Sequence, residues 1–565
     1  MKSKPSYFIV LTIYLFFLVN IYNCSHQSEW NESGSWMSSR QIQTSPRFDL
    51  HSQEEMKKFK AKIPSAKAGS QLLFIWDGIR EDYLDPRILF WQHDHHPLND
   101  NNYISNAWQY TYGGTTPLGK YSTASGAVDV PVPLEIGTYH VYYCYSDVDN
   151  KMELSCIYSV PVAVVKCKSD SDKKTTSTIE HILIIIPENH SFDSIYGKYC
   201  TAPTYSNPTC NEGRNCCEEI TPIQDGIKPF LLNDLENARY NPCHSYQCMM
   251  SEINGGKMDK YLFGGTGSHP HNYVACNGET DSCEYYWKWA KNAAIADRFF
   301  QSSPGASQQG NNYFSNARFL YLDNQYNAQN KHFRGSRCKT GNFIDMNIPT
   351  IADLLNTCDV TWTFFAEGYD ENPSSSQCFP LYYDSGDVPF TFFSSLTESP
   401  TAKENFRDLI HFEEDVNNGT LPSVVYFKGL GLHSEHPGGS ESLNSGQRLS
   451  QRIMDTISNS SLYKNNTVIL VIPDESGGYY DHVPPPEASV IDGFPYGPRT
   501  HFVAVGEQVK KNYVSHVFME PSSTIKFIEW NWLEGTGQLS ARDSVCNNIG
   551  DIFDASKTGV QVPIN

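Results

Sequence analysis

Three short apolar runs decide the fold of this chain: HILIIIP at residues 181–187, SVVYFKG at 423–429 and TVILVIP at 467–473. Stretches with helical patterning, such as SGQRLSQRIMDTIS, alternate with them along the chain. Strands without polar interruption are buried on both faces, which is typical of a mostly parallel sheet covered by helices. We therefore predict an α/β fold in which ligands bind beyond the carboxyl ends of the strands.

The length and composition of the chain narrow the classes of protein to consider. With 565 residues, of which 39% are hydrophobic, the chain can bury a large core in two or three domains. Its 43 basic and 63 acidic residues give a net charge of -20. An acidic surface repels phosphate backbones and anionic lipid, so we expect neither a nucleic-acid partner nor an electrostatic membrane anchor.

The first residues have the pattern of a secretory signal peptide. Lys2 and Lys4 precede an apolar run from Tyr7 to Tyr22, and small and polar residues follow that run. A retained anchor helix is the alternative, but the run is short for a membrane span. We assign residues 1–25 to the signal peptide and expect a secreted protein, or one in the lumen of a secretory or endolysosomal compartment.

Cysteine usage agrees with export. Of the 16 cysteines, all but Cys24 lie beyond the signal peptide, and in an exported chain they predict disulfides. Cys144 and Cys156 flank VDNKM, so we expect a disulfide that closes this hairpin. Because the number beyond the signal peptide is odd, one thiol stays free or pairs elsewhere. The alternative is a zinc site, although the spacings do not repeat as CxxC-like pairs. It would use the clustered Cys200, Cys210, Cys216, Cys217, Cys243, Cys248, Cys276 and Cys283.

Changes in sequence texture divide the chain into segments. After the signal peptide, residues 26–70 are rich in Ser, Gln and Lys and indicate a linker or arm. Residues 71–168 alternate aromatic and β-branched runs with turn residues, which predicts a small all-β sandwich as an accessory domain. Residues 169–178 form a charged linker, and residues 179–565 form the α/β domain. Sequons that predict surface glycans occur at Asn31, Asn418, Asn459 and Asn465.

Acidic side chains follow two of the three apolar runs. Glu188 and Asn189 come after the first run, and Asp474 and Glu475 come after the third. Oxygen ligands from two strand ends suit a divalent cation, and an all-oxygen cage favours Mg, Ca or Mn, whereas a histidine ligand favours Zn or Fe. The alternative is that Glu188 and Asp474 cap the helices that follow.

Candidate nucleophiles and proton donors lie in other loops. In ADRFFQSSPGASQQGNNYF, Ser302, Ser303 and Ser307 surround a Pro-Gly pair, and spacing alone does not choose among them. A hydroxyl beside a divalent cation loses its proton more easily, as attack on phosphorus requires. Histidines in Pro-rich and Gly-rich loops suit proton transfer or phosphoryl binding. They are His244, His436, His482 and His516.

These motifs together resemble one family. IEHILIIIPENHSFDSIYG resembles the opening motif of the phosphoesterase family that includes bacterial phospholipases C and a respiratory-burst-inhibiting acid phosphatase. CHSYQCMMSEINGGKMDKYLF, AIADRFFQSSPGASQQGNNYF, the His-Pro pair at His436 and TVILVIPDESGGYYDHVPPP follow in the order of the family. The resemblance runs from about Ile179 to Phe553. It implies a fold similar to alkaline phosphatase, a three-layer α/β sandwich with a mostly parallel sheet, and makes residues 179–565 a catalytic domain.

The resemblance also implies roles for individual residues. Ser307 falls on the position of the nucleophile, and His244, His436 and His482 look like the histidines that bind substrate and transfer protons. The implied metal ligands are Glu188, Asn189, Asp474 and Glu475. The chain departs from the family where it has PGASQQGNN in place of PGPTxPNR, and where His190 replaces the commoner Arg. The nucleophile and the ligands are kept, so we expect activity and leave the substrate open.

The predicted function is metal-dependent hydrolysis of a phosphoric ester through a phosphoserine at Ser307, of phospholipase C or acid phosphatase type. The expected cofactor is a divalent metal ion. The substrate would be a phosphate ester or a phospholipid, with transient contact to a lipid surface and no obligate protein partner. The alternative is a catalytically inactive, secreted, disulfide-linked binding glycoprotein of the same fold. A serine hydrolase of carboxylic esters is less favoured, since no G-x-S-x-G motif surrounds a candidate serine.

Overall fold

The computed structural model describes residues 58–565 with gaps, together with residues 29–30 (β1, Glu29–Trp30) and 36–37 (β2, Trp36–Met37). The gaps are residues 63, 80, 82, 93–106, 112–119, 121, 147–153, 170–173, 207, 330–340, 370–380, 382 and 439–441. The predicted signal peptide, the sequon at Asn31 and most of the predicted arm lie outside the described residues. Within the described residues, no helix is both long and apolar enough to cross a membrane.

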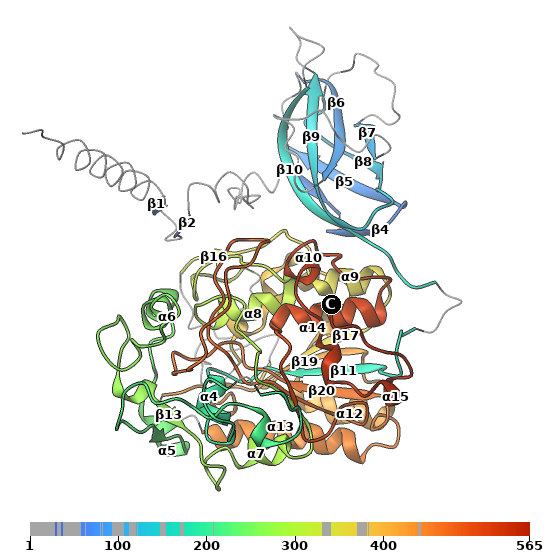
Figure 1. Ribbon diagram of the computed structural model, residues 1–565. Helices are drawn as coiled ribbons and strands as arrows, with labels where there is room; N and C mark the ends of the chain where they lie inside the picture. The colour runs from blue at the N-terminus through green and yellow to red at the C-terminus, as the bar shows by residue number, and fades with distance from the viewer. Residues whose placement is uncertain are drawn as a thin grey trace, which may run out of the picture.

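An eight-stranded sheet forms the centre of the larger body, in the order β18-β17-β19-β11-β20-β21-β14-β22 (Figure 1). The three apolar runs form its neighbouring strands β19 (Val424–Lys428), β11 (His181–Ile185) and β20 (Thr467–Val471). Strand β11 pairs in parallel with both neighbours, so all three strands end at the same edge. The other strands are β14 (Ala294–Ala296), β17 (Trp362–Ala366), β18 (Phe406–Asp408), β21 (Val503–Gly506) and β22 (Tyr513–Ser515).

The sheet is mixed because β21 runs antiparallel to both β20 and β14, whereas the other pairings are parallel. Its two faces are covered by separate cores. Ile182 and Ile184 of β11 belong to one core, and Leu183 and Ile185 belong to the other. Since successive side chains of a strand point to opposite faces, a continuous apolar run fills both cores. The predicted α/β class is confirmed.

Helices cover the sheet on both faces (Figure 1). Residues of α8 (Ser307–Asn316), α9 (Ile351–Thr357) and α14 (Pro521–Trp532) pack in the first core. The second core contains residues of α4 (Phe192–Tyr196), α7 (Glu284–Ala290), α12 (Phe412–Asn418) and α13 (Leu443–Asn459). The remaining helices are α5 (Asp234–Arg239), α6 (Tyr246–Ile253), α10 (Ser394–Thr397), α11 (Ala402–Asn405) and α15 (Ala555–Thr558).

Short elements complete the larger body. Strands β12 (Phe230–Leu231) and β13 (Val274–Ala275) pair with each other, as do β15 (Asn327–Ala328) and β16 (Phe343–Ile344). The 3-10 turns are η1 (Arg214–Cys216), η2 (Pro270–Asn272), η3 (Ser385–Asp387), η4 (Pro389–Phe392), η5 (Leu409–His411), η6 (Gly431–His433), η7 (Arg542–Ser544) and η8 (Ile549–Ile552).

The described part of residues 58–165 contains strands and no helix. A five-stranded sheet, β4-β10-β9-β6-β7, and a three-stranded sheet, β3-β5-β8, share one hydrophobic core. The strands β3 and β4 lie inside the segment predicted as linker or arm, because three residues are too few to produce a periodic pattern. The bounds are β3 (Phe59–Ala61), β4 (Ser65–Lys67), β5 (Gln71–Asp77), β6 (Leu84–Gln92), β7 (Trp108–Tyr110), β8 (Ser125–Pro131), β9 (Gly137–Ser146) and β10 (Leu154–Val165).

Disulfides join many of the described cysteines. The predicted pair Cys144–Cys156 is confirmed, and Cys167–Cys358 ties the end of β10 to the end of α9. The clustered cysteines form the pairs 200–217, 210–216, 243–248 and 276–283. The zinc alternative is therefore wrong, since oxidised sulfurs are not thiolate ligands. Among the described residues Cys546 is the free thiol, and it is buried.

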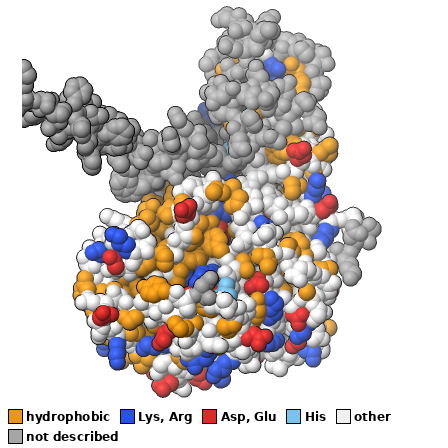
Figure 2. Space-filling model, in the orientation of Figure 1, with side chains coloured by type: hydrophobic (Ala, Val, Ile, Leu, Met, Phe, Trp, Pro, Cys, Tyr) orange, Lys and Arg blue, Asp and Glu red, His pale blue; other side chains and the backbone are white. Residues whose placement is uncertain are grey.

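On the face drawn in Figure 2, the coloured surface is a mosaic of charges of both signs rather than a field of one charge. On the coloured part of the face in Figure 2, apolar side chains gather in the upper left of the larger body, and acidic and basic groups are interspersed along its lower rim. The net charge of the chain is therefore not concentrated on this face.

Candidate active site

The loops that follow β11 and β20 meet at one edge of the central sheet. Glu188-Asn189 follows the first strand and Asp474-Glu475 follows the second. The amide of Asp474 donates a hydrogen bond to the carbonyl of Pro187 at 3.2 Å. Gly477 lies against the other loop, because a Cβ added to it would be 3.0 Å from the Cβ of Asn189. The structure therefore brings the two predicted acidic segments side by side.

The side chains of these segments are buried, and several of their polar atoms lack partners. Glu188, Asn189, Asp474 and Glu475 are at most 2% exposed. Neither polar atom of the Asn189 side chain makes a hydrogen bond within the described residues, nor does Oε1 of Glu475. Leaving such groups unpaired in a protein interior costs about 1–3 kcal/mol each. Buried carboxylate and amide oxygens without partners are the donors that a divalent cation takes, so these residues fit such an ion.

A buried lysine, which sequence reasoning missed, joins the two acidic loops. Lys428 is the last residue of β19, and its Nζ lies 2.9 Å from Oε1 of Glu188 and 3.7 Å from Oδ2 of Asp474. Strand β19 lies beside β11 and two strands away from β20, so the side chain reaches across the end of β11. The sequence signal was a charged residue at the end of an otherwise apolar run.

Burial and charge together shift the pKa values of this group. Burial raises the pKa of Glu188 to about 7, although Lys428 opposes the shift. Burial also raises the pKa of Glu475 well above its ordinary value, and Asp474 adds to the effect. Burial alone would lower the pKa of Lys428, but the Asp474 and Glu188 carboxylates raise it above the ordinary value. The loops therefore concentrate negative charge that one ammonium group offsets in part.

Helix α8 packs its first turns against the acidic loop. A Cβ added to Gly310 would lie 3.0 Å from the carbonyl carbon of Asp474 and 3.6 Å from the Cβ of Glu475. Asn311 donates a hydrogen bond to Oδ2 of Asp474 at 3.4 Å. Ser307 is the first residue of this helix, and residues three and four positions further share its face. The helix face that begins with Ser307 therefore runs along the acidic loop.

The structure distinguishes the three candidate serines. Ser302 donates a hydrogen bond to Glu520 at 2.6 Å, and the hydroxyl of Ser303 accepts one from Gln309 at 2.8 Å. Both hydroxyls are buried in these contacts. Ser307 is 5% exposed, and no hydrogen bond to its hydroxyl occurs within the described residues. Of the three, Ser307 has the hydroxyl that is uncommitted.

Two of the predicted histidines lie together beside the acidic group. The rings of His244 and His436 are 5.7 Å apart at 82°, and Nε2 of His436 is 3.7 Å from Oε2 of Glu188. Each donates Nδ1–H to a nearby backbone carbonyl, at 2.9 and 2.7 Å, which leaves Nε2 as the second titrating atom. Burial, followed by the charge of His436, lowers the pKa of His244 to about 4.

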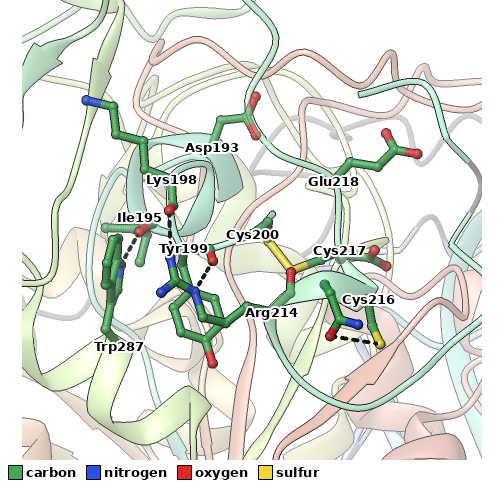
Figure 3. Close-up of a disulfide and its surroundings, with 12 residues drawn as sticks. Asp193, Ile195, Lys198, Tyr199, Cys200, Arg214, Cys216, Cys217, Glu218 and Trp287 are labelled. Atoms are coloured by element: carbon green, nitrogen blue, oxygen red, sulfur yellow. Dashed lines mark hydrogen bonds between the residues drawn. A yellow bond between two sulfur atoms is a disulfide. The ribbon is translucent and has the colours of Figure 1, made fainter. Parts of the chain in front are cut away.

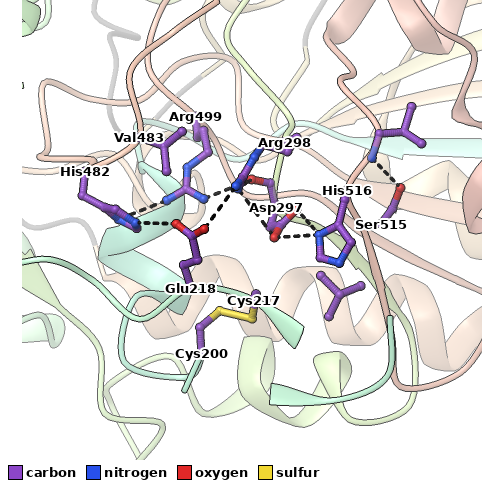
Figure 4. A network of polar contacts seen from close by, with 12 residues as sticks. Cys200, Cys217, Glu218, Asp297, Arg298, His482, Val483, Arg499, Ser515 and His516 are labelled. Carbon is purple, nitrogen blue, oxygen red and sulfur yellow. Dashed lines mark hydrogen bonds and ion pairs between the residues drawn. A yellow bond between two sulfur atoms is a disulfide. The ribbon is translucent and has the colours of Figure 1, made fainter. Parts of the chain in front are cut away.

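His482 lies in a different place, a buried charge network (Figure 4). Its Nδ1 is 2.7 Å from Oδ2 of Asp193, and its Nε2 is 3.4 Å from Glu218. Arg499 pairs with Asp193 at 3.0 Å and with Asp481 at 2.8 Å. Although burial opposes the shift, Asp193 raises the pKa of His482 above its ordinary value. The contacts of His482 thus tie it to this network, whereas those of His436 lie with Glu188.

Three members of this network form the group of described residues whose ligand atoms could hold a metal ion. Atoms of Asp193, Asp481 and His482 lie within 4.8 Å of one another. The predicted carboxylates Glu188, Asp474 and Glu475 do not gather as closely within the described structure. However, the guanidinium of Arg499 already pairs with both aspartates. A second positive charge would repel that of Arg499, so this group is better suited to hold its loops together.

The network continues to the far end of the sheet. Arg298 lies between Glu218 and Asp297, and Asp297 accepts a hydrogen bond from Nδ1 of His516 at 2.9 Å (Figure 4). The second ring nitrogen of His516 is 2.8 Å from the carbonyl of Cys210. Both nitrogens of His516 are therefore occupied by structural contacts.

A disulfide fixes the segment that carries Glu218. Cys200 and Cys217 are bonded, and the guanidinium of Arg214 lies over the rings of Tyr199 and Trp287, at 5.0 and 5.4 Å (Figure 3). Nη2 of Arg214 also donates a hydrogen bond to the carbonyl of Lys198 at 3.2 Å. These contacts hold the loop rigidly against α4.

Comparison with known proteins gives a consistent result. The sequence model described as "Phosphoesterase family" matches residues 179–533. Non-specific phospholipase C6 of Arabidopsis thaliana is 24% identical over 340 residues, which cover 56% of this chain and 56% of that protein. Non-hemolytic phospholipase C of Burkholderia pseudomallei is 21% identical over 449 residues, covering 68% and 60%. Acid phosphatase of Aspergillus fumigatus is 26% identical over 144 residues, covering 24% and 32%. The chain thus spans little more than half the length of the first two relatives.

Proposed function

The chain belongs to the phosphoesterase family, and we propose on this basis that it hydrolyses phosphoric esters, as a phospholipase C or an acid phosphatase. The observation that supports the proposal most strongly is that buried groups from three parts of the chain lie together at one edge of the central sheet. Acidic loops from β11 and β20 share the ammonium of Lys428, and helix α8, which begins at Ser307, packs against the second loop. Phosphate esters or phospholipids are the substrates that the named relatives suggest.

In this proposal Glu188, Asn189, Asp474 and Glu475 hold a divalent metal ion. The unpaired atoms of Asn189 and Glu475 support this assignment. The ion would polarise a phosphoryl oxygen and favour the deprotonated form of a neighbouring hydroxyl. The oxygen ligands suit Mg, Ca or Mn, and a nitrogen from His436 would suit Zn or Fe.

The side chains of the protein carry out the remaining steps. Ser307 releases its proton to solvent and attacks phosphorus, so that a bond from its Oγ forms as the bond to the leaving alkoxide breaks. The amino end of α8 favours the negative charge of the phosphoryl group. His436, which faces Glu188, gives its proton to the leaving alcohol, while His244, with its lowered pKa, is neutral and binds rather than donates. Water then releases phosphate from Ser307.

The rest of the molecule supports export and the proposed architecture. Helices on both faces of the central sheet agree with an alkaline-phosphatase-like sandwich over residues 179–565. The two sheets between residues 59 and 165 agree with an accessory all-β domain over residues 71–168. The six disulfides among the described residues and the exposed sequons at Asn418, Asn459 and Asn465 agree with a secreted or luminal glycoprotein whose residues 1–25 are a signal peptide.

The test is phosphate release from a panel of phosphomonoesters and phospholipids at pH 5 and pH 7.5. Ser307→Ala should lower turnover by about a thousandfold or more with an unchanged thermal midpoint. Ser315→Ala is the matched control, because this serine lies in the same helix and donates its hydrogen bond to the carbonyl of Asn312, within the helix itself. Turnover by Ser307→Ala at the rate of the control would refute the nucleophile. Undiminished turnover after exhaustive chelation would refute the metal ion.

A further inference from the structure

Lys428 lies between acidic groups on two sides. On one side its Nζ pairs with Glu188 and Asp474. On the other side it lines a small cavity of about 10 Å³, together with Glu367, Asp384 and Asp387. Among the described residues that line this cavity, Lys428 alone is basic. Its side chain is 3% exposed, so bulk water screens none of these charges effectively.

Among the described residues, Lys428 is the lysine that pairs with the acidic loops, and His436 adds a positive charge beside Glu188 only while it is protonated. With His436 neutral, the ionised carboxylates of Glu188, Asp474 and Glu475 carry three negative charges, and Lys428 reduces the total to two. One divalent cation balances that total. A buried charge without a partner is unfavourable. With Lys428 present, one divalent cation neutralises the site, whereas two divalent cations would leave it with a surplus of positive charge.

The position of the ammonium group also matters. It lies 2.9 Å from Oε1 of Glu188 and 3.7 Å from Oδ2 of Asp474, so it is paired with one oxygen of each carboxylate. The other oxygen of each carboxylate faces the first cation in our proposal, and a second cation that bridges the two loops would need the oxygens that the ammonium group holds. Within the described residues, the three carboxylates of the predicted cage are also spaced more widely than the group of Asp193, Asp481 and His482, whose ligand atoms lie within 4.8 Å of one another.

We propose that Lys428 limits the acidic site to a single divalent cation, by occupying with its ammonium group the place between Glu188 and Asp474 that a second cation would take. This inference rests on the proposed function, since it assumes a cation held by Glu188, Asn189, Asp474 and Glu475. Lys428 is thus a positioning residue. It orients two of the ligands and fixes the charge of the site without contacting the substrate.

The test is the number of Mn²⁺ ions bound per full-length chain, measured by elemental analysis after removal of free metal. The wild-type protein and Lys428→Arg should each bind one ion, because both keep the positive charge. Lys428→Met removes the charge at similar side-chain length and should bind two. The electron paramagnetic resonance spectrum should then change from that of an isolated Mn²⁺ to that of an exchange-coupled pair.

A second buried lysine provides the matched control. Lys526 is 6% exposed and donates a hydrogen bond to the carbonyl of Cys546, outside the acidic loops. Lys526→Met should still bind one ion. One ion in Lys428→Met, with an unchanged spectrum, would overturn the inference and leave the proposed function standing. Two ions in the wild-type protein would also overturn the inference, and this result does not depend on whether any variant folds. No ion in the wild-type protein would overturn the proposed metal site itself.

Discussion

Replacing Gly477 by alanine should push the two acidic loops apart without replacing any of the candidate site residues. Gly477 has φ +74, and a Cβ there would overlap the carbonyl oxygen of Asn189 and lie 2.7 Å from its carbonyl carbon. The left-handed conformation costs an alanine about 1–2 kcal/mol. Overpacking a tight contact adds about 1–3 kcal/mol. We therefore expect Gly477→Ala to lower the free energy of unfolding by about 2–5 kcal/mol.

Gly226→Ala separates the two contributions. Gly226 has φ +83, and its Cβ would meet nothing within 4 Å, so this variant carries only the conformational cost. Urea unfolding followed by tryptophan fluorescence measures both variants, and Mn²⁺ binding and phosphate release report on the site. Gly477→Ala should lose affinity for Mn²⁺ and activity, while Gly226→Ala keeps both. Equal stability and equal Mn²⁺ affinity in the two variants would refute the argument that contact between the loops builds the site.

Two further predictions concern buried ionisable groups away from the acidic loops. Arg499→Met leaves Asp193 and Asp481 without their shared cation and should lower the free energy of unfolding by about 3–5 kcal/mol, whereas Arg298→Met, at a side chain 24% exposed, should lower it less. Equal losses by urea unfolding would contradict this. Burial raises the pKa of Glu252 from 4.5 to about 9, so the folded state keeps a proton that the unfolded chain releases in this range. The resulting stability is complete below pH 4.5 and is lost as the pH rises toward 9, by about 1.4 kcal/mol per pH unit. Glu252→Gln should therefore gain stability relative to the wild type between pH 5 and pH 8, and parallel stability curves would contradict the assignment.

The sequence was sufficient for those parts of the fold that depend on local pattern. The runs HILIIIP, SVVYFKG and TVILVIP contain the strands β11, β19 and β20. They could be recognised because a strand with apolar residues at successive positions is buried on both of its faces. The acidic pairs after two of these runs lie side by side, since parallel strands end at one edge. The hairpin disulfide Cys144–Cys156 could be predicted because its partners are neighbours in sequence.

Features that depend on strand order and on long-range pairing were not predictable. Lys428 could be assigned to the acidic site only once β19 was known to lie beside β11. The antiparallel direction of β21 has no signal in its own four residues. His482 has the sequence surroundings of a site residue, and only the contacts of Asp193 show that it belongs to a separate network. Clustered cysteines suggested zinc as an alternative, because spacing does not reveal which sulfurs are oxidised together.

The loops that follow β11 and β20 are in contact at two places. The charges are balanced at one place and unbalanced at the other, and this difference distinguishes the candidate site from the group that supports it. After β11 and β20 the loops first bring together Glu188, Asn189 and the segment Asp474-Glu475, where Lys428 offsets the negative charge in part. Further along, they bring together Asp193 and the segment Asp481-His482, where Arg499 bonds both carboxylates. A balanced, fully bonded group fixes the separation of the loops, and an unbalanced one retains attraction for a cation. Arg499→Met should consequently weaken Mn²⁺ binding at Glu188 and Asp474, although the guanidinium touches neither. If the variant folds and binds Mn²⁺ with wild-type affinity, the second contact does not support the first.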